Sequence, residues 1–234
     1  MSTIAPRLSP VHHLLESRGA QWGRLNGTPV ALRFGEDEAE RATLPILGLC
    51  DISVLRKLSV KGPGADGWLR DRGIELPAEI YDTSPLPGGG LVVRLGKNEF
   101  LLEDGIAGET VASLSGQLAA APPGVYRVER EDATFLLTGT RALEVLAQVC
   151  SIDFRNAPRR RLILTRAAGI NCGILPEMLG EVPVFRLWVD CGYAVSLWET
   201  LVEITEELDG KVIGAACCFP ELMALGGASA GDAP

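Results

Sequence analysis

Histidine is scarce in this sequence, and its cysteines do not fall into pairs at metal-binding spacings. The 234 residues include two histidines, His12 and His13, and six cysteines, none of them in a Cys-x-x-Cys motif. Zinc and related sites draw on His and Cys at short fixed spacings, so we expect no metal site. Adjacent residues on a helix point about 100° apart. Ordinary surface or half-buried positions are therefore favoured for both histidines.

An excess of positive charge and long apolar runs are also missing. The formal net charge of −8 disfavours nucleic acids and anionic lipids as partners. Every apolar run is far shorter than the roughly 20 residues that cross a bilayer. The start, MSTIAPRLSPVHHLL, shows no basic segment followed by an apolar one, as a secretory signal would. Together with cysteines scattered among apolar neighbours, these absences predict a cytoplasmic globular protein with reduced thiols.

One motif that is present suggests a nucleotide site. The segment KLSVKGPGADGWL, residues 57–69, begins with an alternating pattern typical of a strand. The motif Gly-x-Gly-x-x-Gly follows, formed by Gly62, Gly64 and Gly67. Asp82 lies about 20 positions further on, as in dinucleotide-binding folds. However, Pro63 removes a backbone N–H where a pyrophosphate needs donors. This argues against a dinucleotide.

An internal repeat offers a simpler explanation of the same glycines. LSVKGPGADGWL at 58–69 aligns without gaps with FLLTGTRALEVL at 135–146, and a looser third copy is LWVDCGYAVSLWETL at 187–201. In the second copy Gly139 replaces Gly62, whereas Gly64 and Gly67 have no glycine counterpart. The repeat predicts a duplicated strand–helix unit with one turn glycine. On this interpretation Gly64 and Gly67 are incidental.

Apolar periodicity and turn residues outline the rest of the chain. The predicted helices are a short one after Ser9 that ends at Gly19, then 107–118, 140–149 and 194–208, with a turn or short helix at 36–41. The predicted strands are 30–34, 46–51, 92–95, 99–102, 125–129, 134–137, 162–165 and 184–189. The linker-like AAAPPG at 119–124 suggests two halves, 1–120 and 121–225, and a disordered tail at 226–234.

Other candidate chemistry is weaker. Asp51 and Asp190 each end an apolar strand and could act as bases, although strand-end caps are commoner. The run Arg159, Arg160, Arg161 could bind a phosphate or an acidic partner, or simply lead into a strand. Cys217 and Cys218 could be reactive vicinal thiols, but core packing is favoured. No nucleophile, base and orienting group can be assembled, so we predict no catalytic residue and leave cofactor-binding residues unassigned.

Several segments resemble the glycine-cleavage T-protein superfamily of aminomethyltransferase-like, folate-binding folds. GLCDIS at 48–53 followed by KLSVKGPGA at 57–65 is similar to that family's signature, a strand with Asp-x-Ser and then a strand ending Val-x-Gly-x-x-Ala. Residues 8–20 and GYAVSLWETL at 192–201 are similar to the small gamma subunit of heterotetrameric sarcosine oxidase. The resemblance implies an α+β fold of two ferredoxin-like halves, without room for the family's C-terminal barrel.

The sequence departs from the transferases of this family. There a Gly-Gly turn leads to a strand with an Asp-Asp pair that works on the folate-bound amine. Here Pro87-Gly88-Gly89-Gly90 leads to Leu91-Val92-Val93-Arg94. The family's folate-lining Gly-Tyr-Thr-Gly-Glu segment is also unmatched, since residues 190–194, DCGYA, lack its carboxylate.

The resemblance therefore implies a non-catalytic subunit in a complex that oxidises an N-methyl amino acid and passes the one-carbon unit to tetrahydrofolate. The resemblance implies large and small flavoprotein subunits as partners, with this chain packed against the folate-binding large subunit. FAD, FMN and NAD are expected only in those partner subunits, and no cofactor in this chain. The alternative is a stand-alone tetrahydrofolate-dependent transferase or folate-binding protein, in which Asp51, Asp82 or Asp190 supplies the lost carboxylate. A small-molecule-binding module without a partner is a third option.

Overall fold

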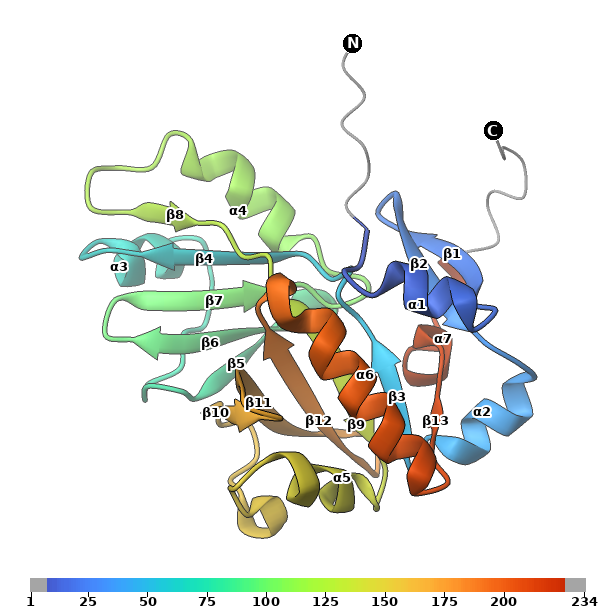
Figure 1. Ribbon diagram of the computed structural model, residues 1–234. Coiled ribbons are helices and arrows are strands. Elements are labelled where there is room, and N and C mark those ends of the chain that lie inside the picture. The colour runs from blue at the N-terminus through green and yellow to red at the C-terminus, as the bar shows by residue number, and fades with distance from the viewer. Residues whose placement is uncertain (1–7, 226–234) are drawn as a thin grey trace. The chain divides into compact units, whose positions relative to one another are not determined.

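A computed structural model describes residues 8–225 and divides them into two compact units (Figure 1). Within the described residues, unit 1 comprises residues 8–54, 133–157 and 164–225, and unit 2 comprises Leu55–Asp132 and Pro158–Ile163. The expected tail at 226–234 lies outside the described residues. None of the helices in the described part of the chain has the length and apolar content needed to cross a membrane.

Unit 1 is built on a six-stranded sheet in the order β10-β11-β12-β9-β3-β13, with β1 and β2 forming a separate hairpin. Its strands are β1 (Gln21–Leu25), β2 (Thr28–Arg33), β3 (Gly48–Asp51), β9 (Ala133–Thr138), β10 (Ile163–Ala167), β11 (Ile170–Leu179), β12 (Val182–Val189) and β13 (Lys211–Val212). Its helices are α1 (His12–Ser17), α2 (Asp37–Thr43), α5 (Ala142–Val149), η2 (Phe154–Asn156), α6 (Cys191–Glu207), α7 (Ala215–Cys218) and α8 (Leu222–Leu225).

The long helix α6 covers the sheet of unit 1 because its apolar residues recur at helical spacing. Leu197, Trp198 and Leu201 are all at least 99% buried, and the Trp198 ring lies 4.9 Å from the ring of Phe135 in β9. Helix α6 packs against β3 and β13, and α5 packs against β12 (Figure 1). This packing fixes the ends of β3 and β12, where two candidate aspartates lie.

Unit 2 is an antiparallel sheet in the order β5-β6-β7-β4-β8 with helices on one face. Its elements are β4 (Lys57–Lys61), α3 (Ala65–Arg70), β5 (Thr83–Leu86), η1 (Pro87–Gly89), β6 (Gly90–Gly96), β7 (Glu99–Glu103), α4 (Thr110–Leu118) and β8 (Tyr126–Val128). One core joins Trp68 of α3 and Leu114 of α4 to the sheet residues Leu58, Val92 and Phe100. Because side chains alternate along a strand, the residues of β4 and β7 next to these core residues point to the other face of the sheet, away from the helices.

The predicted α+β class is confirmed: each unit is an open sheet with helices, and residues 8–225 form no closed barrel. The predicted helices and strands are present with ends displaced by a few residues. The strands β1, β5, β11 and β13 and the short helices α7 and α8 were not predicted. The expected division at 120 and 121 does not separate the two units. Residues 119–124 connect α4 to β8, and β8 pairs with β4, so this segment stays within unit 2.

The predicted duplication is present in the structure. In unit 2, β4 leads through Gly62 into α3, and in unit 1, β9 leads through Gly139 into α5. The alanines at equivalent places, Ala65 and Ala142, are fully buried beneath their helices. In the looser third copy α6 follows β12 directly, and no left-handed glycine is needed there.

Candidate functional site

Strand β6 occupies the place where the resemblance locates the family's reactive carboxylates. The turn at Pro87–Gly89 leads straight into this strand, as in the family pattern. Its first side chains, Leu91, Val92 and Val93, are aliphatic and 94–100% buried. A buried aliphatic side chain neither binds an amine nor moves a proton. Leu91, Val92 and Val93 of β6 therefore offer no group for the chemistry that the resemblance implies at these positions.

The glycines before β6 are explained by close backbone packing. Gly88 has φ +71°, and a Cβ atom there would lie 2.5 Å from the backbone of Ala107 and Gly108. A Cβ atom on Gly105 would lie 2.1 Å from the Gly88 carbonyl oxygen, and one on Gly90 would lie 2.6 Å from that of Glu103. The turn thus lies directly against the backbone that follows β7.

Charged side chains line the helix-free face of β4 and β7. Lys57 and Glu103 form an ion pair of 3.5 Å, with both side chains about 99% buried, and Lys57 Nζ also donates to the Leu55 carbonyl. Nearby, Arg130 Nε donates to Ser59 Oγ at 2.8 Å. These groups escaped the sequence analysis, although the alternation in KLSVK signals that Lys57 and Ser59 share a face. Lys57 pairs with Glu103 and Arg130 pairs with Ser59, so these polar groups satisfy one another, as structural groups do.

The first repeat does not form a phosphate cradle. Gly62 has φ +117°, and the Gly64 N–H donates to the Gly124 carbonyl oxygen at 3.0 Å, so it is already engaged. Helix α3 is only six residues long. A Cβ atom on Gly67 would meet nothing within 4 Å, as an incidental glycine requires. The prediction that Gly64 is also incidental is only partly right, because a Cβ atom on Gly64 would lie 3.1 Å from Val125 Cγ2.

Asp51 and Asp190 act as caps at strand ends in unit 1. Asp51 Oδ1 accepts hydrogen bonds from the Ser53 backbone N–H and hydroxyl, and the Asp51 residue is 94% buried. Asp190 precedes α6, and its Oδ1 accepts the Gly192 N–H at 2.8 Å. The commoner structural interpretation of both carboxylates is therefore confirmed.

Asp82 and the arginine run come together in unit 2. Arg161 Nη1 donates to Asp82 Oδ1 at 2.8 Å, and the two residues form an isolated antiparallel bridge. Thr83 donates its N–H to the Arg160 carbonyl oxygen, and Leu162 donates its N–H to the Tyr81 carbonyl oxygen. The segment leads into β10, as the structural interpretation predicted, while it also pairs alongside β5.

The histidines and cysteines do not assemble into a reactive cluster in the described residues. The ring of His12 stacks on Trp22 at 4.2 Å, and no group of three potential metal ligands occurs in residues 8–225. Burial raises the pKa of Cys217 to about 12. The hydrogen bond with Cys218 and burial raise the pKa of Cys50. Thiols with raised pKa values stay protonated and are poor nucleophiles at neutral pH. This agrees with the interpretation that these cysteines pack in the core.

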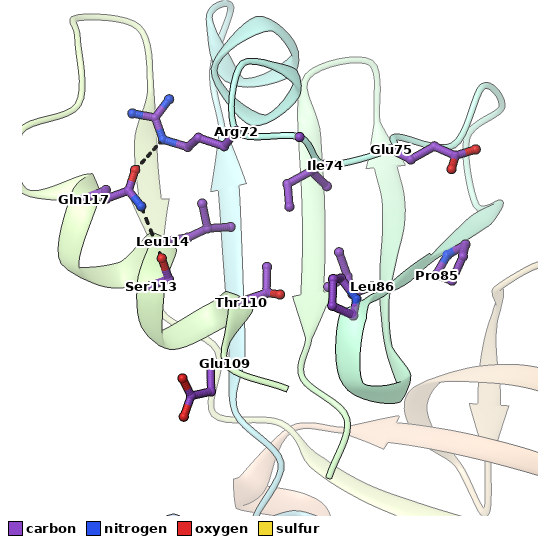
Figure 2. A pocket seen from close by; sticks show the side chains of 12 residues that line it. Arg72, Ile74, Glu75, Pro85, Leu86, Glu109, Thr110, Ser113, Leu114 and Gln117 are labelled. Carbon is purple, nitrogen blue, oxygen red and sulfur yellow. Dashed lines mark hydrogen bonds between the residues drawn. The ribbon is translucent and has the colours of Figure 1, made fainter. Parts of the chain in front are cut away.

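An open groove of about 560 Å³ lies in unit 2, between α4, the segment after α3 and the turn after β5 (Figure 2). Ile74, Leu86 and Leu114 contribute apolar surface, while Arg72, Glu75 and Glu109 contribute charges. No sequence motif marked this groove, because three segments far apart in the chain form it.

These features are those of an aminomethyltransferase fold, and comparison with known proteins agrees. No protein-family profile matches the chain. By sequence it is 24% identical over 227 residues to an aminomethyltransferase of Saccharopolyspora erythraea and 24% identical over 214 residues to one of Deinococcus deserti. These matches cover 91% and 86% of this chain, but only 62% and 60% of the two relatives. The chain thus spans less than two thirds of their length.

By structure, the chain is similar to the glycine cleavage system aminomethyltransferase T of Bartonella henselae, with a TM-score of 0.74 and 19% identity over 92% of this chain and 61% of that one. The chain therefore shares the fold of that aminomethyltransferase. It is also similar to a chain of the heterotetrameric sarcosine oxidase of Corynebacterium sp. U-96, with a TM-score of 0.61 and 22% identity. That match covers 86% of this chain and 95% of the sarcosine oxidase chain.

Proposed function

We propose that this chain is a subunit of a sarcosine oxidase-type complex and has no active site of its own. The observation that carries the proposal is strand β6, where the chemistry of an aminomethyltransferase would require a carboxylate and Leu91, Val92 and Val93 stand instead. On this proposal the flavins, NAD and the folate site belong to partner chains. The similarity to nearly the whole of one sarcosine oxidase chain supports it.

Tetrahydrofolate is the cofactor that the fold implies, and β6 does not fit its chemistry. Leu91 and Val93 offer no group that could hold a folate-bound amine or accept its proton. The substitutes considered from sequence are engaged elsewhere: Asp51 with Ser53, Asp82 with Arg161 and Asp190 with Gly192. We derive no catalytic step for this chain.

A second candidate is a tetrahydrofolate-dependent transferase or folate-binding protein that acts alone. The higher TM-score to an aminomethyltransferase, 0.74 against 0.61, favours it. It requires a carboxylate to be released from one of the caps or the ion pair described above. It therefore predicts measurable affinity of the isolated chain for tetrahydrofolate.

The two functions are separated by native purification of the chain, tagged at its own gene. The subunit proposal predicts co-elution with larger polypeptides in constant ratio and a flavin absorption spectrum in the same fractions. Tetrahydrofolate titrated calorimetrically into the separately purified chain should give no saturable heat. A lone, folded chain that binds tetrahydrofolate saturably and shows no flavin would overturn the proposal in favour of the transferase.

A further inference from the structure

A small hollow in unit 1 lies where β2, α2, α7 and α8 come together. Its walls include Arg33 of β2, Asp37 of α2, Cys217 of α7 and Met223 of α8, and its volume of about 10 Å³ corresponds to roughly one water molecule. Helix α7 packs against both β2 and α2 (Figure 1). The fold thus places two sulfur-containing side chains beside an arginine and a carboxylate at one spot on unit 1.

The thioether of Met223 accepts a hydrogen bond from the arginine of this hollow. Arg33 Nη2 donates to Met223 Sδ at 3.1 Å, while Arg33 Nη1 lies 3.0 Å from Asp37 Oδ1. The carboxylate therefore holds the guanidinium, whose other NH2 group is directed at the sulfur. A thioether is a weak acceptor, so this cationic donor is poorly matched by its present partner.

Oxidation of the sulfur would supply a stronger acceptor at the same place. Methionine sulfoxide carries an oxygen atom on its sulfur and is polar where methionine is apolar. A sulfoxide oxygen next to Arg33 Nη2 accepts a charge-assisted hydrogen bond, which is stronger than a bond between neutral groups. The position of Arg33 therefore suits the oxidised side chain of residue 223 better than the reduced one.

Met223 is also the sulfur of the hollow that is open to reaction. Its exposed fraction is 37%, so a dissolved oxidant reaches it. Cys217 reacts as a thiolate, and burial raises the pKa of Cys217 to about 12, which keeps it protonated at neutral pH. A thioether has no proton to lose before it reacts. Oxidation at this hollow is therefore expected at Met223 rather than at Cys217.

Met178 of β11 provides a comparison within the same unit. Its exposed fraction is also 37%, and it forms no hydrogen bond with the described residues. Its neighbour across the β11–β12 ladder is Pro183, which has no N–H to donate. The two methionines therefore differ in the presence of an arginine rather than in access to solvent.

We propose that Met223 is an oxidation site whose sulfoxide is held by Arg33, so that mild oxidation fastens α8 to β2. A lone pair of the Met223 sulfur attacks one oxygen of hydrogen peroxide, an S–O bond forms and the O–O bond breaks. The departing hydroxide takes the proton of the transferred oxygen and leaves as water. The sulfur is oxidised by two electrons and the peroxide is reduced by two. Methionine sulfoxide reductases reverse the change. This site does not depend on the proposed function.

The test is a double-mutant cycle in the full chain. Met178→Leu serves as the background, so that Met223 is the sole methionine in residues 8–225. Dilute hydrogen peroxide oxidises Met223, and peptide mass spectrometry measures the extent. The melting temperature of this protein should rise by about 1–3 °C on oxidation. With Arg33→Leu added, the same oxidation should give no rise, because the donor is gone. Arg33→Gln, which removes the charge and keeps a donor, should give a smaller rise.

The matched control is Met223→Leu, which leaves Met178 as the methionine of the described residues. Oxidation of Met178 should lower the melting temperature or leave it unchanged, because no donor is placed to bind its sulfoxide. In the wild type, Met223 should be oxidised at least as fast as Met178, since the two side chains are equally exposed. Circular dichroism verifies that each variant folds.

The outcomes decide the role of Arg33. A rise in melting temperature that depends on Arg33 and is absent from the Met223→Leu control supports the oxidation site. If oxidation of Met223 changes the melting temperature equally with and without Arg33, the arginine does not hold the sulfoxide and the proposal is overturned. Oxidation of Met223 that is much slower than that of Met178 also overturns it, because the sulfur is then shielded. None of these results bears on the subunit function, which native purification tests.

Discussion

In both copies of the repeat a strand runs into a short helix through one left-handed glycine, Gly62 in unit 2 and Gly139 in unit 1. A Cβ atom on Gly62 would lie 2.2 Å from the Gly124 carbonyl oxygen, and one on Gly139 would lie 2.4 Å from the Ile46 carbonyl oxygen. The next helical positions differ freely: Gly64 and Gly67 in one copy correspond to Arg141 and Glu144 in the other. The shared feature is a backbone crossing at the turn.

The comparison shows why the first copy imitates a nucleotide fingerprint. In unit 1 the positions of the second and third glycines form a salt bridge, with Arg141 Nε 2.9 Å from Glu144 Oε1. A surface ion pair takes the place of the two glycines there, so the turn itself does not require them. The duplicated turn therefore requires one glycine, and the other two satisfy the motif without its function.

The largest effect is expected at the two turn glycines themselves. Gly62→Ala and Gly139→Ala should each lower the free energy of unfolding by about 3 kcal/mol or more, because a left-handed conformation and a clash with backbone act together. Urea unfolding followed by circular dichroism measures both. If one variant is as stable as wild type, the two turns are not equivalent, and the comparison fails.

A smaller effect is expected where the units differ in their buried carboxylates. In unit 1, one oxygen of Glu40 accepts the N–H groups of Phe34 and Gly35, and the other accepts the Gly214 N–H at 2.7 Å. Glu40→Gln turns an amide NH2 toward one of these donors and should lower the free energy of unfolding by about 2 kcal/mol. Glu38→Gln on the exposed side of α2 is the matched control and should change it by less than about 0.5 kcal/mol.

Asp104, one of the buried carboxylates of unit 2, should behave in the opposite way. Burial raises the pKa of Asp104 in the folded state, so ionising it opposes folding at neutral pH. This penalty shrinks as the pH falls through the raised pKa of Asp104 in the folded state, and it is gone below the pKa that Asp104 has in the unfolded chain. Asp104→Asn should therefore remain within about 1 kcal/mol of wild type at pH 7. Relative to this variant, the wild type should gain stability toward pH 4.

Asp153 in unit 1 is a control for that experiment, because its effect on stability should change with pH in the opposite direction. Arg155 lowers the pKa of Asp153 to about 2, so the contribution of Asp153 to stability is complete well above the ordinary aspartate pKa and is lost as the pH falls through that ordinary value toward about 2. Relative to Asp153→Asn, the wild type should lose a little stability toward pH 4. Equal trends for the two variants would contradict the assigned environments.

Local signals could predict much of the fold, and contacts between distant segments could not be predicted. Gly96, Lys97 and Asn98 mark the hairpin of β6 and β7, and helical spacing marks α6. Strand β11 was missed because Pro176 interrupts it and its central residues are buried on both faces rather than alternately. The domain boundary was misplaced because the pairing of β8 with β4 leaves no trace in composition.

The candidate site divides in the same way. The aliphatic character of β6 is visible in Leu91, Val92 and Val93 once the preceding glycines fix the register. The roles of Asp51 and Asp190 also follow from their neighbours in sequence. The groove and the buried pair of Lys57 with Glu103 depend on chain segments that only folding brings together, so no local pattern contains them.

The smallest effect tests the glycine that the repeat makes dispensable. Gly67 lies within α3, its added Cβ would meet nothing within 4 Å, and the second copy has Glu144 in its place. Gly67→Ala should raise the free energy of unfolding by up to about 1 kcal/mol, since alanine restricts the unfolded chain and favours the helix. Gly64→Ala should not share this gain, because its Cβ would press on Val125. Loss of stability in Gly67→Ala would mean that the third glycine serves something other than the turn, and the nucleotide-like motif would then require a new explanation.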